Sequence, residues 1–138
     1  MAMMTKAKNN MKKSRMTNIK GIGTDIIEIE RLRLVIKRKG QPFLEKIFTE
    51  VERKYCIKFK DSTLHYAARF SAKEAIAKAL GTGFGKDLSF LDIEITNDEK
   101  GKPLVNLSKA AEKRFNRPKI LISISHTDTL AIAFVMIS

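Results

Sequence analysis

The chain has 138 residues, a formal net charge of +12 and 43% hydrophobic residues. This length fits one domain, and the hydrophobic share supports a buried core, which argues against a disordered chain. No apolar run approaches the roughly 18 residues that a membrane-spanning helix needs. The single cysteine, Cys56, cannot form an internal disulfide, so a reducing cytoplasm is expected and the thiol is interpreted as a packed apolar group.

Much of the positive charge lies in the first 17 residues, which hold five lysine or arginine residues and no acid. This segment lacks the apolar region of a secretory signal. We interpret 1–17 as a disordered basic leader, a cloning remnant or translation upstream of Met16, and expect 18–138 to form a single domain. The remaining excess of +7 predicts an acidic partner, which could be nucleic acid, an anionic lipid surface, a phosphorylated ligand or an acidic protein.

The first predicted element is a strand over about 19–29, within the stretch GIGTDIIEIERL. Alternation along a strand places Asp25 on the same face as Ile27 and Ile29. An ionised carboxylate on an apolar face loses hydration, which only hydrogen bonds, a cation or protonation offset. Asp25 therefore needs a partner.

Three helices are predicted next. The first is short, amphipathic and basic, and it ends at Gly40. The second begins at Thr49, which has the spacing of a capping box with Glu52, and continues to about residue 59. The third is the longest, an alanine-rich helix over about 63–80 that Ser62 can cap.

The second half of the chain changes to strand periodicity. Strands are expected over about 90–96 and 103–107, joined as a hairpin, followed by a short helix that Ser108 caps. Two further strands are expected over 119–126 and 129–138. This order of elements predicts an α+β domain in which helices pack against an antiparallel sheet.

The glycines of GTGFGK, residues 81–86, do not form a nucleotide loop in this interpretation. They follow a helix instead of a strand, and Leu80 stands where the phosphate-loop pattern needs glycine. A helix end followed by a turn explains them better.

Glu74, in the long predicted helix, has two interpretations. With Lys78 four residues later, it can form an exposed ion pair of small energetic value. It also shares a stripe with apolar Phe70, which is typical of a buried face. If the helix packs on the first strand, Asp25 and Glu74 converge, and two carboxylates with room for water are a common Mg²⁺ site. A separately hydrogen-bonded Asp25 is the alternative.

His126 ends a predicted strand in ISISHTDTL. It is either a hydrogen-bonded turn residue or, with Ser123, Ser125 and Thr127 nearby, part of a phosphate-binding turn. Neither histidine lies in a zinc-binding pattern.

Taken together, GIGTDIIEIERL, RFSAKEAIAKALGTG and ISISHTDTLAIAFV resemble the holo-acyl-carrier-protein synthases, small bacterial 4′-phosphopantetheinyl transferases. The resemblance runs from about residue 19 to residue 138. It implies the fold of that family and the transfer of phosphopantetheine from coenzyme A to a serine of an apo acyl carrier protein, with release of adenosine 3′,5′-bisphosphate. Such chemistry depends on positioning and on neutralising phosphoryl charge.

The same resemblance assigns roles to residues. Asp25 and Glu74 match the carboxylates that hold Mg²⁺, and Lys78 matches a lysine placed to meet phosphate or assist the hydroxyl. His126, followed by Thr127, matches the motif at the nucleotide end of coenzyme A. The resemblance also implies a homotrimer with sites between subunits.

The charge excess has a use in this family, because carrier proteins are acidic. Arg31 occupies the position at which family members present a basic residue to the carrier, whereas Arg33 and Lys37 are interpreted as parts of a solvated helix face.

Two other functions would also explain parts of this sequence. A small basic RNA-binding protein would explain a pI near 10.0, but the predicted strands lack exposed aromatic pairs for base stacking. A non-catalytic carrier-binding module is disfavoured by the presence of Asp25, Glu74 and His126. The preferred function involves neither nucleic acid nor a membrane.

Overall fold

The structure, a computed structural model, describes residues 18–138, so the predicted basic leader lies outside the described residues. The elements in chain order are β1 (Gly21–Glu28), α2 (Ile29–Lys39), α3 (Gln41–Ile47), α4 (Glu50–Cys56), α5 (Ser62–Leu80), the 3₁₀ turn η1 (Phe90–Asp92), β2 (Ile93–Asn97), β3 (Pro103–Leu107), α6 (Lys109–Arg114), β4 (Ile120–His126) and β5 (Leu130–Ile137). Among these residues, no helix combines the length and apolar character needed to cross a membrane.

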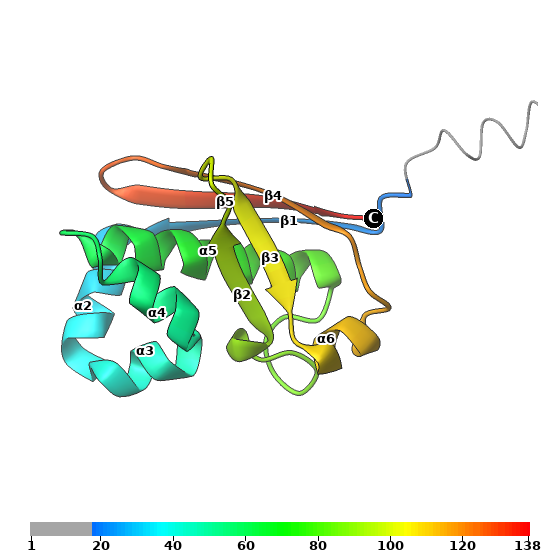
Figure 1. Cartoon of the computed structure of the whole chain (residues 1–138), viewed down its shortest axis with the longest axis horizontal. Helices are drawn as coiled ribbons and strands as arrows, with labels where there is room; N and C mark the ends of the chain where they lie inside the picture. Colours follow the sequence, from blue (N-terminus) through cyan, green and yellow to red (C-terminus); the bar gives the residue numbers. More distant parts are fainter. Residues whose placement is uncertain (1–17) are drawn as a thin grey trace, which may run out of the picture.

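The strands form two antiparallel sheets instead of one. Strands β1, β5 and β4 make a three-stranded sheet with β5 in the centre, and β2 pairs with β3 as the predicted hairpin. Helix α5 runs under the three-stranded sheet, the hairpin crosses α5 from the other side, and α2 to α4 gather at one end (Figure 1). The predicted α+β class is confirmed, with α5 as its central helix.

Small residues allow α5 to approach the sheet closely. The buried face of α5 is rich in alanine, and it packs against Ala133, Val135 and Ile137 of β5. On the β1 side, a Cβ atom added to Gly23 would lie 2.1 Å from the carbonyl oxygen of Ala75. Glycine in β1 is therefore required by close contact with the α5 backbone.

We expect Gly23→Ala to destabilise the protein by about 3 kcal/mol or more, because the added methyl group overlaps backbone atoms that cannot rotate away. Thermal or urea unfolding measures the loss. Gly101→Ala is the matched control: Gly101 has φ of 85° and open space around it, so the same substitution there costs only conformational strain, about 1–2 kcal/mol. Equal losses in the two variants would contradict the close approach of β1 and α5.

Several predicted boundaries were wrong for local reasons. Ser62 is the first residue of α5, and Asp61 takes the cap position. The strand predicted from residue 90 begins only at Ile93, because Asp92 accepts hydrogen bonds from Ser89 and folds Phe90–Asp92 into the turn η1. The capping box of Thr49 and Glu52 is confirmed, but α4 ends at Cys56, earlier than expected.

Helix α3 was not predicted at all. Its seven residues follow directly on Gly40, whose φ of 68° turns the chain between two helices. Phe43, Leu44 and Ile47 have helical spacing and pack into the core cluster around Phe48. Pro42 at the start of a helix was a further signal that the sequence carried.

Candidate active site

Asp25 and Glu74 approach each other between β1 and α5. Asp25 pairs in register with Ala133, which is buried against α5. Paired residues on neighbouring antiparallel strands point to the same face, so the Asp25 side chain is on the helix-facing side of the sheet. Its carbonyl oxygen accepts a hydrogen bond from Ser71 Oγ at 2.9 Å, which fixes β1 to α5 three residues before Glu74. Burial, with the nearby negative charge of Asp25, raises the pKa of the Glu74 carboxyl above its usual value.

Lys78 lies one turn beyond Glu74, but its ion pair is with Asp25. Its Nζ atom is 3.1 Å from Asp25 Oδ1 and donates to the carbonyl oxygen of Thr24 at 2.9 Å. Asp25 is only 16% exposed, whereas the Lys78 side chain is 54% exposed. Lys78 is thus the solvent-facing cation of the group, and its ammonium is a partner of Asp25 that the sequence did not predict.

The Asp25–Glu74 pair suits Mg²⁺, which takes most of its ligands from water and substrate, better than it suits a metal ion that needs three or more protein ligands. Between residues 18 and 138 there is no group of three or more His, Cys, Asp or Glu side chains placed to hold a metal ion. Mg²⁺ commonly uses one or two carboxylates and completes its octahedron with water and substrate phosphate. A carboxyl group whose pKa is raised by burial and by a neighbouring carboxylate, as that of Glu74 is, is a fitting environment for a divalent cation.

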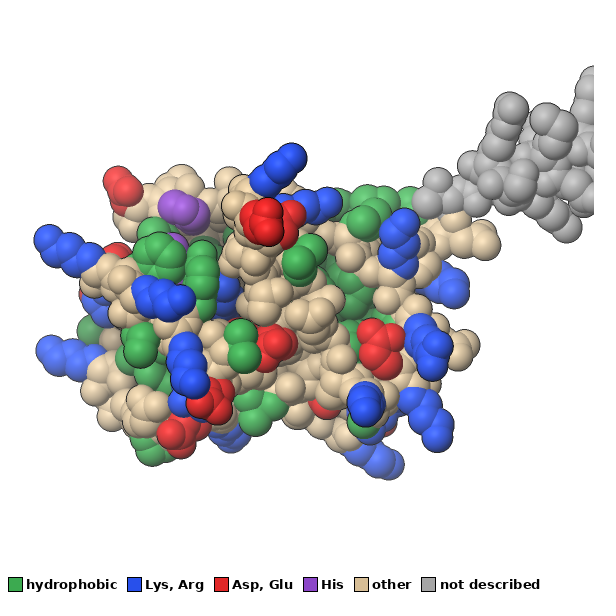
Figure 2. Space-filling view, in the orientation of Figure 1, with side chains coloured by type: hydrophobic (Ala, Val, Ile, Leu, Met, Phe, Trp, Pro, Cys, Tyr) green, Lys and Arg blue, Asp and Glu red, His purple; other side chains and the backbone are tan. Residues whose placement is uncertain are grey.

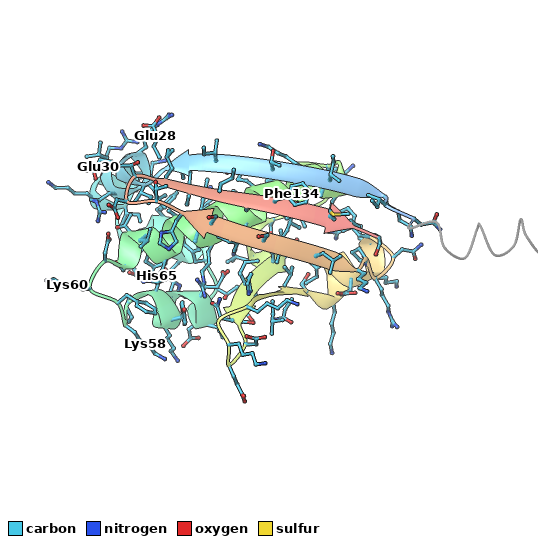
Figure 3. The ribbon with its side chains drawn as sticks, turned by 90° about the horizontal axis from the view of Figure 1, so that it is seen from above. Glu28, Glu30, Lys58, Lys60, His65 and Phe134 are labelled. Atoms are coloured by element: carbon cyan, nitrogen blue, oxygen red, sulfur yellow. The ribbon has the colours of Figure 1, made fainter. Side chains whose placement is uncertain are left out.

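His126 lies at a different edge of the sheet. It ends β4, opposite Ala131 of β5, while β1 flanks β5 on its other side. Two strand spacings, about 9–10 Å, therefore separate the strands of Asp25 and His126 within one chain. The histidine side chains gather above the beginning of α5 (Figure 2), and His65 lies beside the end of β4 (Figure 3).

The turn after His126 is ordered by Thr127. Its hydroxyl oxygen accepts hydrogen bonds from the backbone N–H groups of Leu130 at 3.0 Å and Thr129 at 3.3 Å. His126 itself is exposed, and its Nδ1 lies 3.4 Å from the Thr127 carbonyl oxygen. The turn therefore holds His126 at the surface.

Arg31 lines a pocket of about 480 Å³ between β1 and α2. The other lining residues are Ile26, Ile27, Glu28, Leu32, Val35, Phe43, Phe70 and Leu130. Ile27 is two residues after Asp25, and Phe70 is one helical turn before Glu74, so the pocket lies close to the carboxylates along β1 and α5, although neither carboxylate lines it. Arg33, in contrast, is engaged by Asp61 at 3.0 Å and 3.2 Å, as well as by Glu30.

The sequence profile described as "4′-phosphopantetheinyl transferase superfamily" matches residues 21–135. The chain belongs to this superfamily. A holo-[acyl-carrier-protein] synthase of Protochlamydia amoebophila is 53% identical over 116 residues, which cover 84% of this chain and 95% of that relative.

Solved structures of the superfamily are similar in fold as well. The holo-(acyl-carrier-protein) synthase from Bacillus anthracis, in complex with CoA (3′,5′-ADP), has a TM-score of 0.75 and 42% identity, covering 86% of this chain and 96% of that one. The enzyme from Neisseria meningitidis has a TM-score of 0.82 and 35% identity, covering 87% and 98%. The resemblance inferred from the three motifs is confirmed.

This transferase-superfamily chain also contains an aromatic and basic cluster at the beginning of α5 that the sequence did not predict. Phe59 stacks on His65 with 3.7 Å between ring centroids, and the Arg69 guanidinium lies 4.1 Å from the Tyr55 ring centroid. Burial, then Arg69 and His126, lowers the pKa of His65. His65 and Arg69 lie one turn apart on α5, which was an available signal. Tyr55 on α4 and Phe59 after the end of α4 come from a different segment, so their approach depends on tertiary packing.

Proposed function

We propose that this chain transfers the 4′-phosphopantetheine group of coenzyme A to a serine of an apo acyl carrier protein, yielding the holo carrier and adenosine 3′,5′-bisphosphate. The serine oxygen forms a bond to the phosphorus that carries the pantetheine arm, and the bond from that phosphorus to the nucleotide phosphate oxygen breaks. The observation that carries this proposal is the convergence of Asp25 and Glu74 beside Lys78 in a member of the superfamily.

Asp25 and Glu74 are the residues that would hold Mg²⁺. The bound ion would supply neutralisation of charge on the pyrophosphate oxygens. Lys78, with its largely exposed ammonium at the same site, is placed to contact a phosphate of coenzyme A or to assist the serine hydroxyl. His126 and Thr127 are assigned to the nucleotide end of coenzyme A, at the exposed turn after β4.

The pocket beside Arg31 is the proposed docking point of the carrier protein. Its walls are mostly apolar, and Arg31 supplies a cation at the rim. Because Asp61 and Glu30 already engage Arg33, Arg31 is the better candidate for an acidic carrier residue. The position next to Asp25 and Glu74 would bring the carrier serine toward the reacting phosphate.

We further propose a homotrimer in which Asp25 and Glu74 of one subunit act with His126 of the next. Within one chain, β5 separates Asp25 from His126. The sheet face opposite α5 carries Phe134 and other exposed apolar side chains (Figure 3), namely Ile22, Ile26, Leu121 and Ile132. Such a face is suited to burial between subunits.

The proposed setting of this reaction is the cytoplasm, and the buried free thiol of Cys56 is consistent with a reducing compartment. Because the chain belongs to the superfamily, we prefer this function to RNA binding. An acidic carrier and a phosphorylated substrate explain the positive charge of the chain.

The direct test is to incubate the purified chain with coenzyme A, Mg²⁺ and an apo acyl carrier protein, and to weigh the carrier by mass spectrometry. We expect one phosphopantetheine per carrier, and no addition when a chelator removes the divalent metal. A carrier of unchanged mass with several apo carriers, given folded protein, would refute the proposed activity.

The docking role of Arg31 predicts that Arg31→Glu raises the KM for the carrier about tenfold or more, while the KM for coenzyme A changes little. Added salt should weaken the wild-type enzyme in the same direction, because it screens the charges that attract the carrier. Steady-state kinetics with each substrate varied in turn measure both effects.

Lys109→Glu provides the matched control, since it makes the same charge change on α6, far from α2 (Figure 1). It should leave both KM values near those of the wild type. If Arg31→Glu affected the two substrates equally, Arg31 would have no specific role in docking.

A further inference from the structure

A buried ion pair joins α4 to α5 directly behind the candidate site. Glu52 Oε1 and Lys73 Nζ are 2.6 Å apart, and both side chains have 0% exposure. Lys73 is adjacent to Glu74 in sequence, and the two point in different directions because successive residues on a helix are about 100° apart. Lys73 enters the layer that contains α3, α4, η1 and β2, whereas Glu74 approaches β1.

Every hydrogen-bonding direction of the Lys73 ammonium is used. Besides Glu52, it donates to the carbonyl oxygens of Ile47 at 2.8 Å and Phe90 at 3.0 Å. The Glu52 carboxylate in turn accepts from the backbone N–H groups of Thr49 and Ile95, each at 2.9 Å. One closed network therefore fixes the ends of α3 and α4, the turn η1 and strand β2 to a single point on α5.

Stability alone is a weak explanation for such a pair. A buried ion pair can often be replaced by apolar side chains of similar volume without loss of stability. The charged groups add a fixed geometry, because three acceptors from three different segments define one position for the Lys73 Nζ atom. We propose that Lys73 is a positioning residue whose ion pair with Glu52 sets the rotation of α5 and thereby the approach of Glu74 to Asp25.

The alanine-rich surface of α5 explains why such an anchor is needed. The buried residues that flank Glu74 on this helix include Ala72, Ala75, Ala77 and Ala79. Small side chains form shallow ridges, which resist rotation of a helix about its axis less than interlocking large side chains do. A preorganised site tolerates a change of no more than about 10–20° in the direction of a ligand.

This inference rests on the proposed role of Glu74 in Mg²⁺ binding, so the test measures binding separately from turnover. The variants are Glu52→Gln, the double variant Glu52→Gln/Lys73→Met and, as reference, Glu74→Gln. Isothermal titration calorimetry follows Mg²⁺ binding to each protein with coenzyme A present and carrier absent, and circular dichroism records folding and Tm. Loss of a residue that orients a metal ligand typically weakens binding 10–100-fold.

We expect the double variant to be folded at the temperature of the titration, with a Tm well above it. It should bind Mg²⁺ at least tenfold more weakly than the wild type, with a parallel fall in kcat. Glu52→Gln should lose less affinity, because the ammonium keeps its two backbone carbonyl acceptors. The exposed pair of Glu50 and Lys54, 2.9 Å apart on α4, gives a control with the same two substitutions, Glu50→Gln/Lys54→Met, and no expected change. Val105→Ala, in β3, controls for reduced stability without loss of the network.

The outcomes separate the two proposals. Wild-type Mg²⁺ affinity in Glu52→Gln and the double variant, with affinity lost in Glu74→Gln, would overturn the positioning role of Lys73 alone. Wild-type affinity in Glu74→Gln would overturn the proposed metal site itself. If the double variant fails to fold, Glu52→Gln decides: an affinity equal to that of the wild type would refute the inference, and a loss larger than that of Val105→Ala would support it.

Discussion

Asp25→Ala and Glu74→Gln are each expected to lower kcat by roughly two to three orders of magnitude, while the fold is retained. In the proposed reaction, these carboxylates place positive charge where the pyrophosphate oxygens gain negative charge. Neither side chain contributes to the core: Asp25 pairs with the exposed Lys78, and the pKa of Glu74 is raised mainly by the cost of burying its charge. Neutralising Glu74 therefore removes an unfavourable interaction with Asp25.

Phosphopantetheinylation of the carrier, followed over time at saturating substrates, measures the loss, and thermal unfolding checks the fold. Glu99→Gln in the exposed β2–β3 turn is the control, because it removes an equal charge away from the site. Near-normal turnover in Asp25→Ala or Glu74→Gln would remove that residue from the site. A large fall in Tm would indicate instead that the carboxylate has a structural role.

Much of the fold was predictable because local signals and tertiary packing agree. The alternation of β1, the capping box at Thr49 and the long α5 before Gly81 each follow from a local rule that the structure obeys. The division into two sheets was not predictable in this way. It depends on which strand pairs with which, and β1 and β5 are joined across almost the whole sequence.

In the site, too, features that depend on neighbouring residues in the sequence were predictable, and contacts between distant segments were not. The side of the strand to which Asp25 points followed from alternation alone, and it is confirmed by the burial of its register partner Ala133. That Lys78 pairs with Asp25 was not predicted, because spacing within α5 favoured a pair with Glu74. The burial of Glu52 and Lys73 was missed for a related reason. Charged residues are usually exposed, and only a partner from another element reverses that expectation.

The proposed shared cleft leads to the second large effect. Inactive Asp25→Ala and inactive His126→Ala proteins, unfolded and refolded together, should regain partial activity. In a mixed trimer, some interfaces would pair a native Asp25 from one subunit with a native His126 from the next. Within one chain, β5 lies between the strands of Asp25 and His126 and separates these strands by about 9–10 Å, so the two residues are not on adjacent strands.

The mixture of Asp25→Ala with Glu74→Ala is the matched control. Asp25 and Glu74 approach each other within one chain, so no subunit of this mixture holds an intact pair, and no activity should return. Native mass spectrometry of subunits labelled with different isotopes establishes that mixed trimers have formed in both experiments. Given mixed trimers, failure of the first mixture would refute the cleft between subunits, since native Asp25 and native His126 would then be present at some interfaces without effect. Recovery in the second mixture would show that Asp25 and Glu74 act from different subunits, because only then could two chains that each lack one carboxylate restore the pair.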